Sequence, residues 1–402
     1  MRVRTGGALT IAVLSVVYWA AHTMLRPLVG PFVLDLGGTA AQASTALAAF
    51  AVLPTVLAIP IGFLVDRLGH RRLLVWGSLA MIAGGGLLLL GTIPAVIAGQ
   101  LVVGLGTLAV WVALQAAATL PTGAAETRDE RNRRIASFSL FVSAGQLVGP
   151  ALGGAVAELA GFRTSVGVFV GLSVLLVVVT HLGVRRATAV PAAAAGAASV
   201  ALLPGLGRSY LDALRLLRSR AVLITVAASF LALVVLDLRT AFQPLHLQSI
   251  GFSPLWTGLL LTTAATASFI SRPAFGPLVR WLPAPLLVGL VLGVGSVSVA
   301  AVNGFALGFA QPLTLALMAD HTDAAQRGLA VGIRSMANRG AQLADPVAFG
   351  LLLAAFGTRT AFLAMGAALL VLSVVTGLAF VWVRPPPDVV DVAPAQPVAA
   401  HR

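Results

Sequence analysis

The sequence predicts an all-α integral membrane protein whose twelve transmembrane helices form two pseudo-symmetric six-helix bundles. Three observations predict this class: the composition, a series of apolar segments of membrane-spanning length, and an internal repeat. Of the 402 residues, 58% are hydrophobic and only 10% are charged, whereas soluble domains carry about 25% charged residues. With a mean hydropathy of +0.98, the chain has too little polar surface for a soluble fold of this length.

Twelve apolar segments follow one another along the chain, and a helix of about 20 apolar residues crosses a bilayer. The first segment follows Arg2 and Arg4, as a signal peptide would. Its length and the lack of a small-residue cleavage site predict a retained span instead. The ninth and tenth segments are the shortest, because they share residues 284–319. The expected spans are 8–33, 42–64, 73–92, 94–118, 135–158, 162–183, 221–244, 254–275, 284–301, 302–319, 328–353 and 360–383.

The arginines predict how the chain is oriented. All 26 basic residues are Arg. With the N-terminus in the cytoplasm, twenty of them fall on the cytoplasmic side and only Arg163 and Arg359 fall outside. Since cytoplasmic loops carry the excess of basic residues, we expect a multi-pass protein of the plasma membrane with both termini in the cytoplasm. The same distribution explains the net charge of +13 without nucleic-acid binding.

The spans divide the chain into four expected regions. A basic amphipathic helix near 208–219 is expected in the connection between the bundles, lying on the inner leaflet. The regions are an N-terminal six-helix bundle at 1–183, a cytoplasmic linker at 184–219, a C-terminal six-helix bundle at 220–383 and a disordered tail at 384–402.

Two motifs recur in the same order in both halves of the chain. They indicate a duplicated six-span unit, an organisation that many secondary transporters share, with a site between the halves at mid-membrane. The recurring pairs are Leu25-Arg26-x4-Pro31 with Leu238-Arg239-x4-Pro244, and Arg131-x14-Gln146-Leu147-x2-Pro150 with Arg327-x14-Gln342-Leu343-x2-Pro346.

The loop expected between spans 2 and 3 carries the pattern G-x3-D-R-x-G-x-R-R. This pattern, in this loop, resembles the signature loop of the major facilitator superfamily. The resemblance implies alternating access by two rocking bundles, and a clasp between them that helps to hold the outward-facing state. A merely topogenic basic loop is the alternative, but it explains the arginines and not the acid or the glycines. The residues concerned are Gly62, Asp66, Arg67, Gly69, Arg71 and Arg72.

Span 5 carries small residues at helical spacing, as Gly145-x3-Gly149-Pro150-x2-Gly153-Gly154. This pattern resembles the antiporter motif of drug:proton exporters in the same superfamily. Glycines at this spacing let helices approach closely, so a generic packing face is the alternative interpretation.

Span 4 departs from those exporters. They commonly have R-x3-G-x-G in this span, and this chain has Gln100-x3-Gly104-x-Gly106. Gln100 cannot supply the charge credited with proton coupling in relatives. Either that charge lies elsewhere in this chain, or the protein does not exchange protons.

Arg26 and Arg239 lie at repeat-equivalent positions in spans 1 and 7. A charge inside a span costs about 2.5–3.5 kcal/mol on insertion scales, so each needs a partner, a cavity or a function. Organophosphate exchangers of the superfamily are similar in clamping an anion between two such arginines. Alternatively, the two arginines snorkel outward or pair locally, for example with Asp35 or Asp237. Asp237 itself either carries a proton or a cationic substrate, or forms a structural ion pair with an arginine.

Further polar side chains share helix faces inside the spans. Tyr18, His22 and Arg26 lie on one face of span 1. His22 is either a proton carrier or a packing residue. Span 11 has a polar stripe, which is either water-filled or internally paired, as in an ion pair between Arg339 and Asp345. The stripe consists of Arg334, Asn338, Gln342 and Asp345, and the other candidates for the cavity are Gln100, Trp111, Gln115 and Gln311.

Taken together, these residues favour export of a small organic compound in exchange for protons. Enzymatic activity is not expected, since the sequence has no Lys, no Cys and no recognisable catalytic or metal-ligand cluster. The expected partners are a small molecule, protons and the lipid bilayer, with no cofactor, no metal and no nucleic acid, and the expected state is a monomer. Two alternatives remain open: uptake or exchange of a small organic anion, and a non-transporting membrane sensor.

Overall fold

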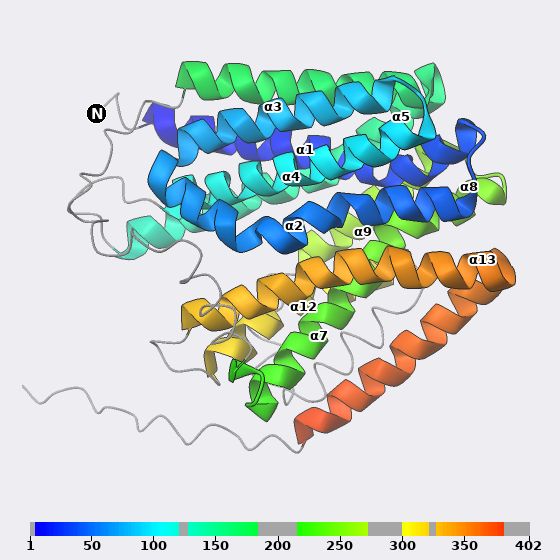
Figure 1. The fold of residues 1–402 in the computed structure, drawn as a ribbon. Coiled ribbons are helices and arrows are strands. Elements are labelled where there is room, and N and C mark those ends of the chain that lie inside the picture. The colour runs from blue at the N-terminus through cyan, green and yellow to red at the C-terminus, as the bar shows by residue number, and fades with distance from the viewer. Residues whose placement is uncertain (1–4, 120–127, 184–214, 272–299, 321–326, 382–402) are drawn as a thin grey trace, which may run out of the picture.

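The computed structural model describes residues 5–119, 128–183, 215–271, 300–320 and 327–381. Every regular element in these ranges is a helix (Figure 1). Seven stretches within them are long and apolar enough to cross a membrane. The elements are α1 Thr5–Asp35, α2 Ala40–Leu68, α3 His70–Leu89, α4 Ile93–Thr119, α5 Arg128–Gly183, α7 Arg220–Asp237, the π-helix η1 Leu238–Phe242, α8 Gln243–Ser249, α9 Pro254–Ser271, α12 Ala300–Asp320 and α13 Arg327–Val381.

The two longest helices each contain two spans. The backbone of α5 turns at Gly161 (φ 84°) and that of α13 turns at Gly357 (φ 76°), where the sequence predicts the breaks between spans 5 and 6 and between spans 11 and 12. With these turns, the described helices correspond to every expected span except the ninth. Residues 284–299 of that span, most of the linker helix near 208–219 and the tail at 384–402 lie outside the described residues.

We expect Gly161→Ala to lower the stability of the protein. Gly161 has φ 84° and ψ 165°, a conformation essentially confined to glycine, so a side chain there costs about 1–3 kcal/mol. Thermal unfolding of the purified protein measures this loss. Gly167→Ala is the matched control, because Gly167 is helical and a Cβ there meets open space. Equal unfolding temperatures for the two variants would contradict the expectation.

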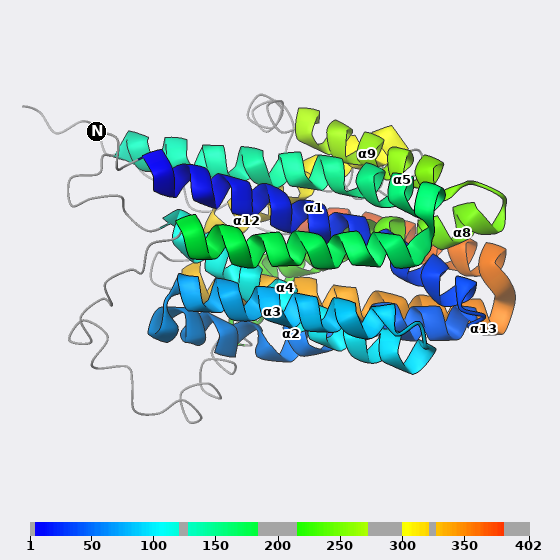
Figure 2. The same cartoon turned by 90° about the horizontal axis from the view of Figure 1, so that it is seen from above.

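Helices pack within each half and between the halves. In the N-terminal half, α1 packs along α5 and α3 packs along α4 (Figure 2). In the C-terminal half, α7 packs against α13 and α9 against α12. The halves meet where α5 contacts α9, α2 contacts α13, and α1 contacts η1 and α8.

Two of these contacts between the halves are related by the repeat and depend on glycine. A Cβ on Gly154 of α5 would lie 3.1 Å from the carbonyl carbon of Pro254 in α9. Its repeat counterpart, Gly350 of α13, would meet the Cβ of Ser44 in α2 at 2.7 Å. The same approach of small residues therefore occurs twice, as two pseudo-symmetric bundles require.

Both glycine contacts lie at one end of the helix bundle. We call it the α8 end, because it holds α8 together with the turns at 35–40, 249–254, Gly161 and Gly357 (Figure 1). The opposite end, the N-terminal end, holds the first residues of α1, α5 and α7. The glycine contacts between the halves therefore join them at the α8 end.

Candidate functional site

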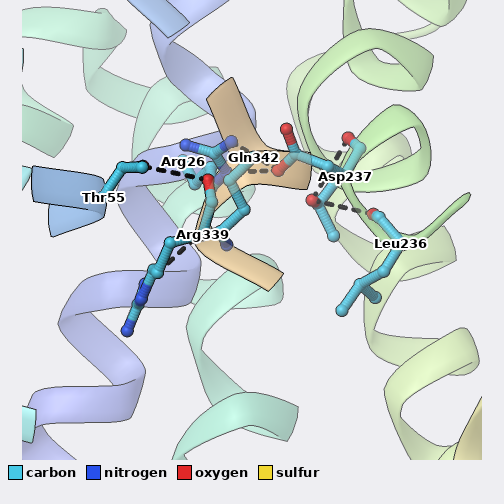
Figure 3. Close-up of polar contacts among 7 residues, drawn as sticks. Arg26, Thr55, Leu236, Asp237, Arg339 and Gln342 are labelled. Carbon is cyan, nitrogen blue, oxygen red and sulfur yellow. Dashed lines mark hydrogen bonds and ion pairs between the residues drawn. The ribbon is translucent and has the colours of Figure 1, made fainter. Parts of the chain in front are cut away.

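Arg26 of α1 and Asp237 of α7 form an ion pair between the two halves (Figure 3). The Arg26 Nε donates to Asp237 Oδ1 at 2.9 Å, and the Arg26 Nη2 donates to the same oxygen. The two side chains are only 7% and 2% exposed. Removing one partner of such a buried pair leaves an uncompensated charge, which costs about 3–5 kcal/mol. The pair therefore ties α1 to α7.

The helix that carries Asp237 changes its winding immediately after this residue. α7 ends at Asp237, and η1 continues the helix with π-type winding through Leu238–Phe242. Pro244 lies at the start of α8, and since proline has no N–H, it cannot bond to the carbonyl of Thr240 as a helix residue would. Single π-helical turns occur frequently at functional sites. Sequence reasoning missed this turn, although Pro244 was the available signal.

The guanidinium of Arg26 also contacts the N-terminal half. Its Cζ lies 4.9 Å from the centre of the Phe50 ring, within the range of a cation–π interaction. A small pocket opens beside the two side chains, and Gln100 of α4 contributes to it with an amide nitrogen that has no hydrogen-bond partner among the described residues. The pocket is lined by His22, Leu25, Arg26, Phe50, Gln100, Val103, Thr107 and Phe169.

An aromatic cluster continues from this pocket toward the N-terminal end. The Tyr18 hydroxyl donates to the Thr107 carbonyl oxygen at 2.9 Å. Its ring stacks on His22 and on Trp111, with centroids 5.9 and 6.1 Å apart. Trp19 adds an edge contact with Trp111 at 5.0 Å. The cluster therefore places aromatic rings with few polar atoms next to the pocket.

The polar stripe predicted on span 11 makes contacts within the C-terminal half. Arg334 is 7% exposed, and its Nη1 donates to the hydroxyls of Ser229 and Thr314 at 3.4 Å each. The Ser229 hydroxyl in turn donates to the Asn338 Oδ1 at 2.7 Å. Among the described residues, Arg334 has no carboxylate partner.

Arg339 bonds to Gln342 rather than to Asp345. Its Nη1 donates to the Gln342 Oε1 at 3.0 Å, and its carbonyl oxygen accepts from the Thr55 hydroxyl of α2 at 3.2 Å (Figure 3). The internal ion pair between Arg339 and Asp345 that the sequence left open is therefore absent among the described residues.

Asp345 is a buried acid without a hydrogen-bond partner. Its side chain is 1% exposed, and neither carboxylate oxygen has a partner among the described residues. It lies near enough to Asp237 and Arg26 to interact with both charges. Within the ranges that the structure describes, no group of three or more His, Asp or Glu side chains is placed to hold a metal ion. The chemistry available at the site is ion pairing and proton binding.

The glycines of span 5 lie on two faces of α5. A Cβ on Gly145 or Gly149 would meet the backbone of α1, and one on Gly153 would lie 2.7 Å from the Met24 carbonyl oxygen. Gly154 faces α9 instead, across Pro254. Pro150 is buried between them, and its carbonyl oxygen adjoins Gly258 of α9.

Other residues predicted for the site lie elsewhere. The Gln115 side chain is exposed near the end of α4, and Arg239 lies half-buried in η1. In the loop motif, Gly69 has φ 78° at the turn between α2 and α3, and a Cβ added at Gly62 would meet nothing within 4 Å. Arg71 and Arg72 lie in the first turn of α3. The side chains of Asp66, Arg67 and Gln311 lie outside the described residues.

Comparison with known proteins shows a family and a fold. The fold is similar to that of the peptide transporter POT in complex with sulfate, with a TM-score of 0.72 and 17% identity over 93% of this chain and 94% of that chain. It is also similar to a variant of the nucleoside transporter NupG, with a TM-score of 0.73 and 14% identity over 94% of this chain and 99% of that chain. No curated protein sequence matches the chain.

At these identities the two structures show the fold alone. The family rests on a separate finding, the family model described as Major Facilitator Superfamily, which matches residues 11–301 and 296–400. Because that match extends over most of the chain, the protein belongs to the major facilitator superfamily and is a membrane transporter rather than an enzyme.

Proposed function

We propose that the protein is a secondary active transporter that exports a small organic compound in exchange for protons by alternating access. The observation that carries the proposal is the buried Arg26–Asp237 ion pair, because it joins the two halves that must separate. In this proposal the α8 end faces the outside and the N-terminal end faces the cytoplasm, as the arginine distribution predicts. The clasp at the span 2–3 loop belongs to the same proposal.

The ion pair gives a physical reason for coupling. Opening the α8 end separates α1 from α7 and removes Arg26 from Asp237. The separated carboxylate needs a replacement partner, because an isolated charge is strongly disfavoured at low dielectric. In one half of the cycle the substrate supplies that partner, and in the other half a proton neutralises Asp237. Proton and substrate then occupy the site alternately, which is exchange.

The surroundings of the pair support an organic substrate. His22, Phe50 and Gln100 line the pocket beside Arg26. The Tyr18 ring stacks on His22 and on Trp111, on the side toward the N-terminal end. A compound that enters from the cytoplasm would meet the rings first and the charges last. The glycine pattern of α5, which resembles that of drug:proton exporters, supports export over uptake.

Proton-coupled flux in inverted vesicles tests the proposal. A pH gradient is imposed, and lipophilic cations, neutral metabolites and organic anions are added in turn while a pH-sensitive dye is read. We expect cations or neutral compounds to collapse the gradient in a protein-dependent way. Asp237→Asn is expected to slow the collapse at least about ten-fold, because losing about 1.4 kcal/mol of interaction free energy at the site already corresponds to a tenfold change.

Asp35→Asn is the matched control for this experiment. It makes the same substitution at an exposed acid at the end of α1, and we expect it to leave the collapse unchanged. Retention of full proton-coupled flux by Asp237→Asn would contradict the proposal. If the folded protein collapses the pH gradient with none of the compounds, the result would favour the non-transporting sensor.

A second candidate function is uptake or exchange of a small organic anion. The observation that favours it is Arg334, a buried cation without a carboxylate partner among the described residues, together with Arg26 and Arg239 in the spans. A response to anions alone in the same vesicles, lost in Arg334→Gln, would support this function over export of a cation or a neutral compound.

A further inference from the structure

Asp345 lies at the same level of the bundle as Asp237. α7 and α13 both start at the N-terminal end (Figure 1) and pack against each other. Two contacts fix their register. The Ser229 hydroxyl meets Asn338 at 2.7 Å, and further along the rings of Phe242 and Phe349 lie 4.4 Å apart. Between these two contacts, Asp345 comes opposite Asp237.

Only one of these two acids is paired. Asp237 accepts two hydrogen bonds from Arg26, whereas both oxygens of Asp345 lack a partner among the described residues. α2 also packs against α13, and its described side chains include no charged residue. The charged or titratable side chains on the elements around Asp345 include Arg334 and Arg339 of α13, Asp237 of α7, Arg239 of η1, His246 of α8, and Tyr18, His22 and Arg26 of α1.

Among the described residues, nothing donates a hydrogen bond to Asp345, whereas Arg26 donates two to Asp237. Arg339 is also positive, but its guanidinium donates to the neutral amide of Gln342 and forms no ion pair with either acid. Two neighbouring carboxylates removed from water cannot both remain ionised, so the pair retains a proton. Arg26 stabilises the ionised form of the acid that it bonds, and the proton resides on the other.

We propose that Asp237 and Asp345 share a single proton, and that Arg26 decides which of the two carries it. In the conformation described, Asp345 is the neutral acid. When Arg26 leaves Asp237 and approaches Asp345, the O–H bond of Asp345 breaks and an O–H bond forms on Asp237. At most one of the two acids is protonated at a time, so the pair binds one proton per protein and not two.

Infrared spectroscopy of the protein in lipid nanodiscs tests this assignment without a substrate. The measured signal is the C=O stretching band of a protonated carboxyl at neutral pH. We expect the wild-type protein to show such a band and Asp345→Asn to lack it. In Asp237→Asn the band is also expected to disappear, because Arg26 is then free to bond Asp345 and to ionise it.

The double variant makes the test decisive. Arg26→Gln with Asp237→Asn removes the arginine that would move to Asp345, so the band is expected to return. Asp35→Asn, at an exposed acid, should leave the band unchanged. A wild-type band that survives Asp345→Asn, or one that persists in Asp237→Asn alone, would overturn the proposal.

If Asp345→Asn does not fold, Asp345→Glu replaces it, and the band is expected to shift to the frequency of a glutamic acid. An unshifted band then overturns the assignment.

The role of the shared proton in transport rests on the proposed function, but the spectroscopic assignment does not. If the band pattern is absent but proton-coupled flux is intact, the shared proton is refuted and the proposed export function stands. The full band pattern without any proton-coupled flux would leave the shared proton and refute the exporter.

Discussion

Arg26→Gln is expected to lower the free energy of unfolding by about 3–5 kcal/mol, the cost of leaving one partner of a buried ion pair uncompensated. Asp237 loses its ion-pair partner in this variant. Asp237→Asn is expected to cost less, because Arg26 then still has Asp345 within reach. Thermal or denaturant unfolding of the reconstituted protein measures the two values.

The double variant Arg26→Gln with Asp237→Asn separates pairing from packing. If the ion pair dominates, the double variant loses less unfolding free energy than the two single variants lose together. The double-mutant cycle then shows a favourable coupling energy between Arg26 and Asp237. Losses that simply add would contradict the pairing. A loss in Asp237→Asn that equals or exceeds that in Arg26→Gln would argue against Asp345 as a replacement partner.

Gly154→Val is expected to open the α8 end. The added side chain meets the Pro254 carbonyl group, whose carbon lies 3.1 Å from the position of a Cβ, and this neighbour is backbone that cannot rotate away. Overpacking of this kind costs about 1–3 kcal/mol, which corresponds to about a 5- to 150-fold shift between two conformations. Since the contact exists only while α5 and α9 are together, the cost falls on the closed α8 end.

The chain offers a direct readout of this shift, because it has no natural cysteine. Leu255 lies beside Glu158, whose carboxylate accepts from the Leu255 N–H at 3.4 Å. A single cysteine at position 255 should react faster with a membrane-impermeant maleimide in the Gly154→Val background. Gly167→Val is the control, because a Cβ at Gly167 meets open space. Equal labelling rates in the two backgrounds would refute the expected opening.

Span positions could be predicted from the sequence because the bilayer requires about 20 apolar residues for each crossing. The sequence predicts short loops after residues 158 and 353. The structure has turns at the single residues Gly161 and Gly357 instead. Hydropathy does not distinguish a short loop from a glycine turn, because both leave the flanking segments apolar.

The sequence predicts which residues belong to the candidate site, but not how they are arranged. The cost of burying Arg26 and Asp237 singles them out, and their pairing was one of two interpretations. Asp345 was identified from helical spacing, but its level relative to Asp237 depends on the register of α7 against α13, which a single sequence does not contain. The sequence predicts Gln115 for the cavity together with Trp111, yet the Gln115 side chain is exposed near the helix end.

The close contact of α1 with α5 has a consequence for how the duplicated halves have diverged. By the repeat, Met24 corresponds to Asp237, and Gly149 corresponds to Asp345. In the first copy these positions form a tight apolar seam, with Gly149 against the backbone of α1. In the second copy the same positions hold two acids. The first copy thus keeps a tight apolar contact at the positions where the second copy holds two acids. In the proposed mechanism, the acids therefore lie in the C-terminal half, opposite Arg26 of the N-terminal half.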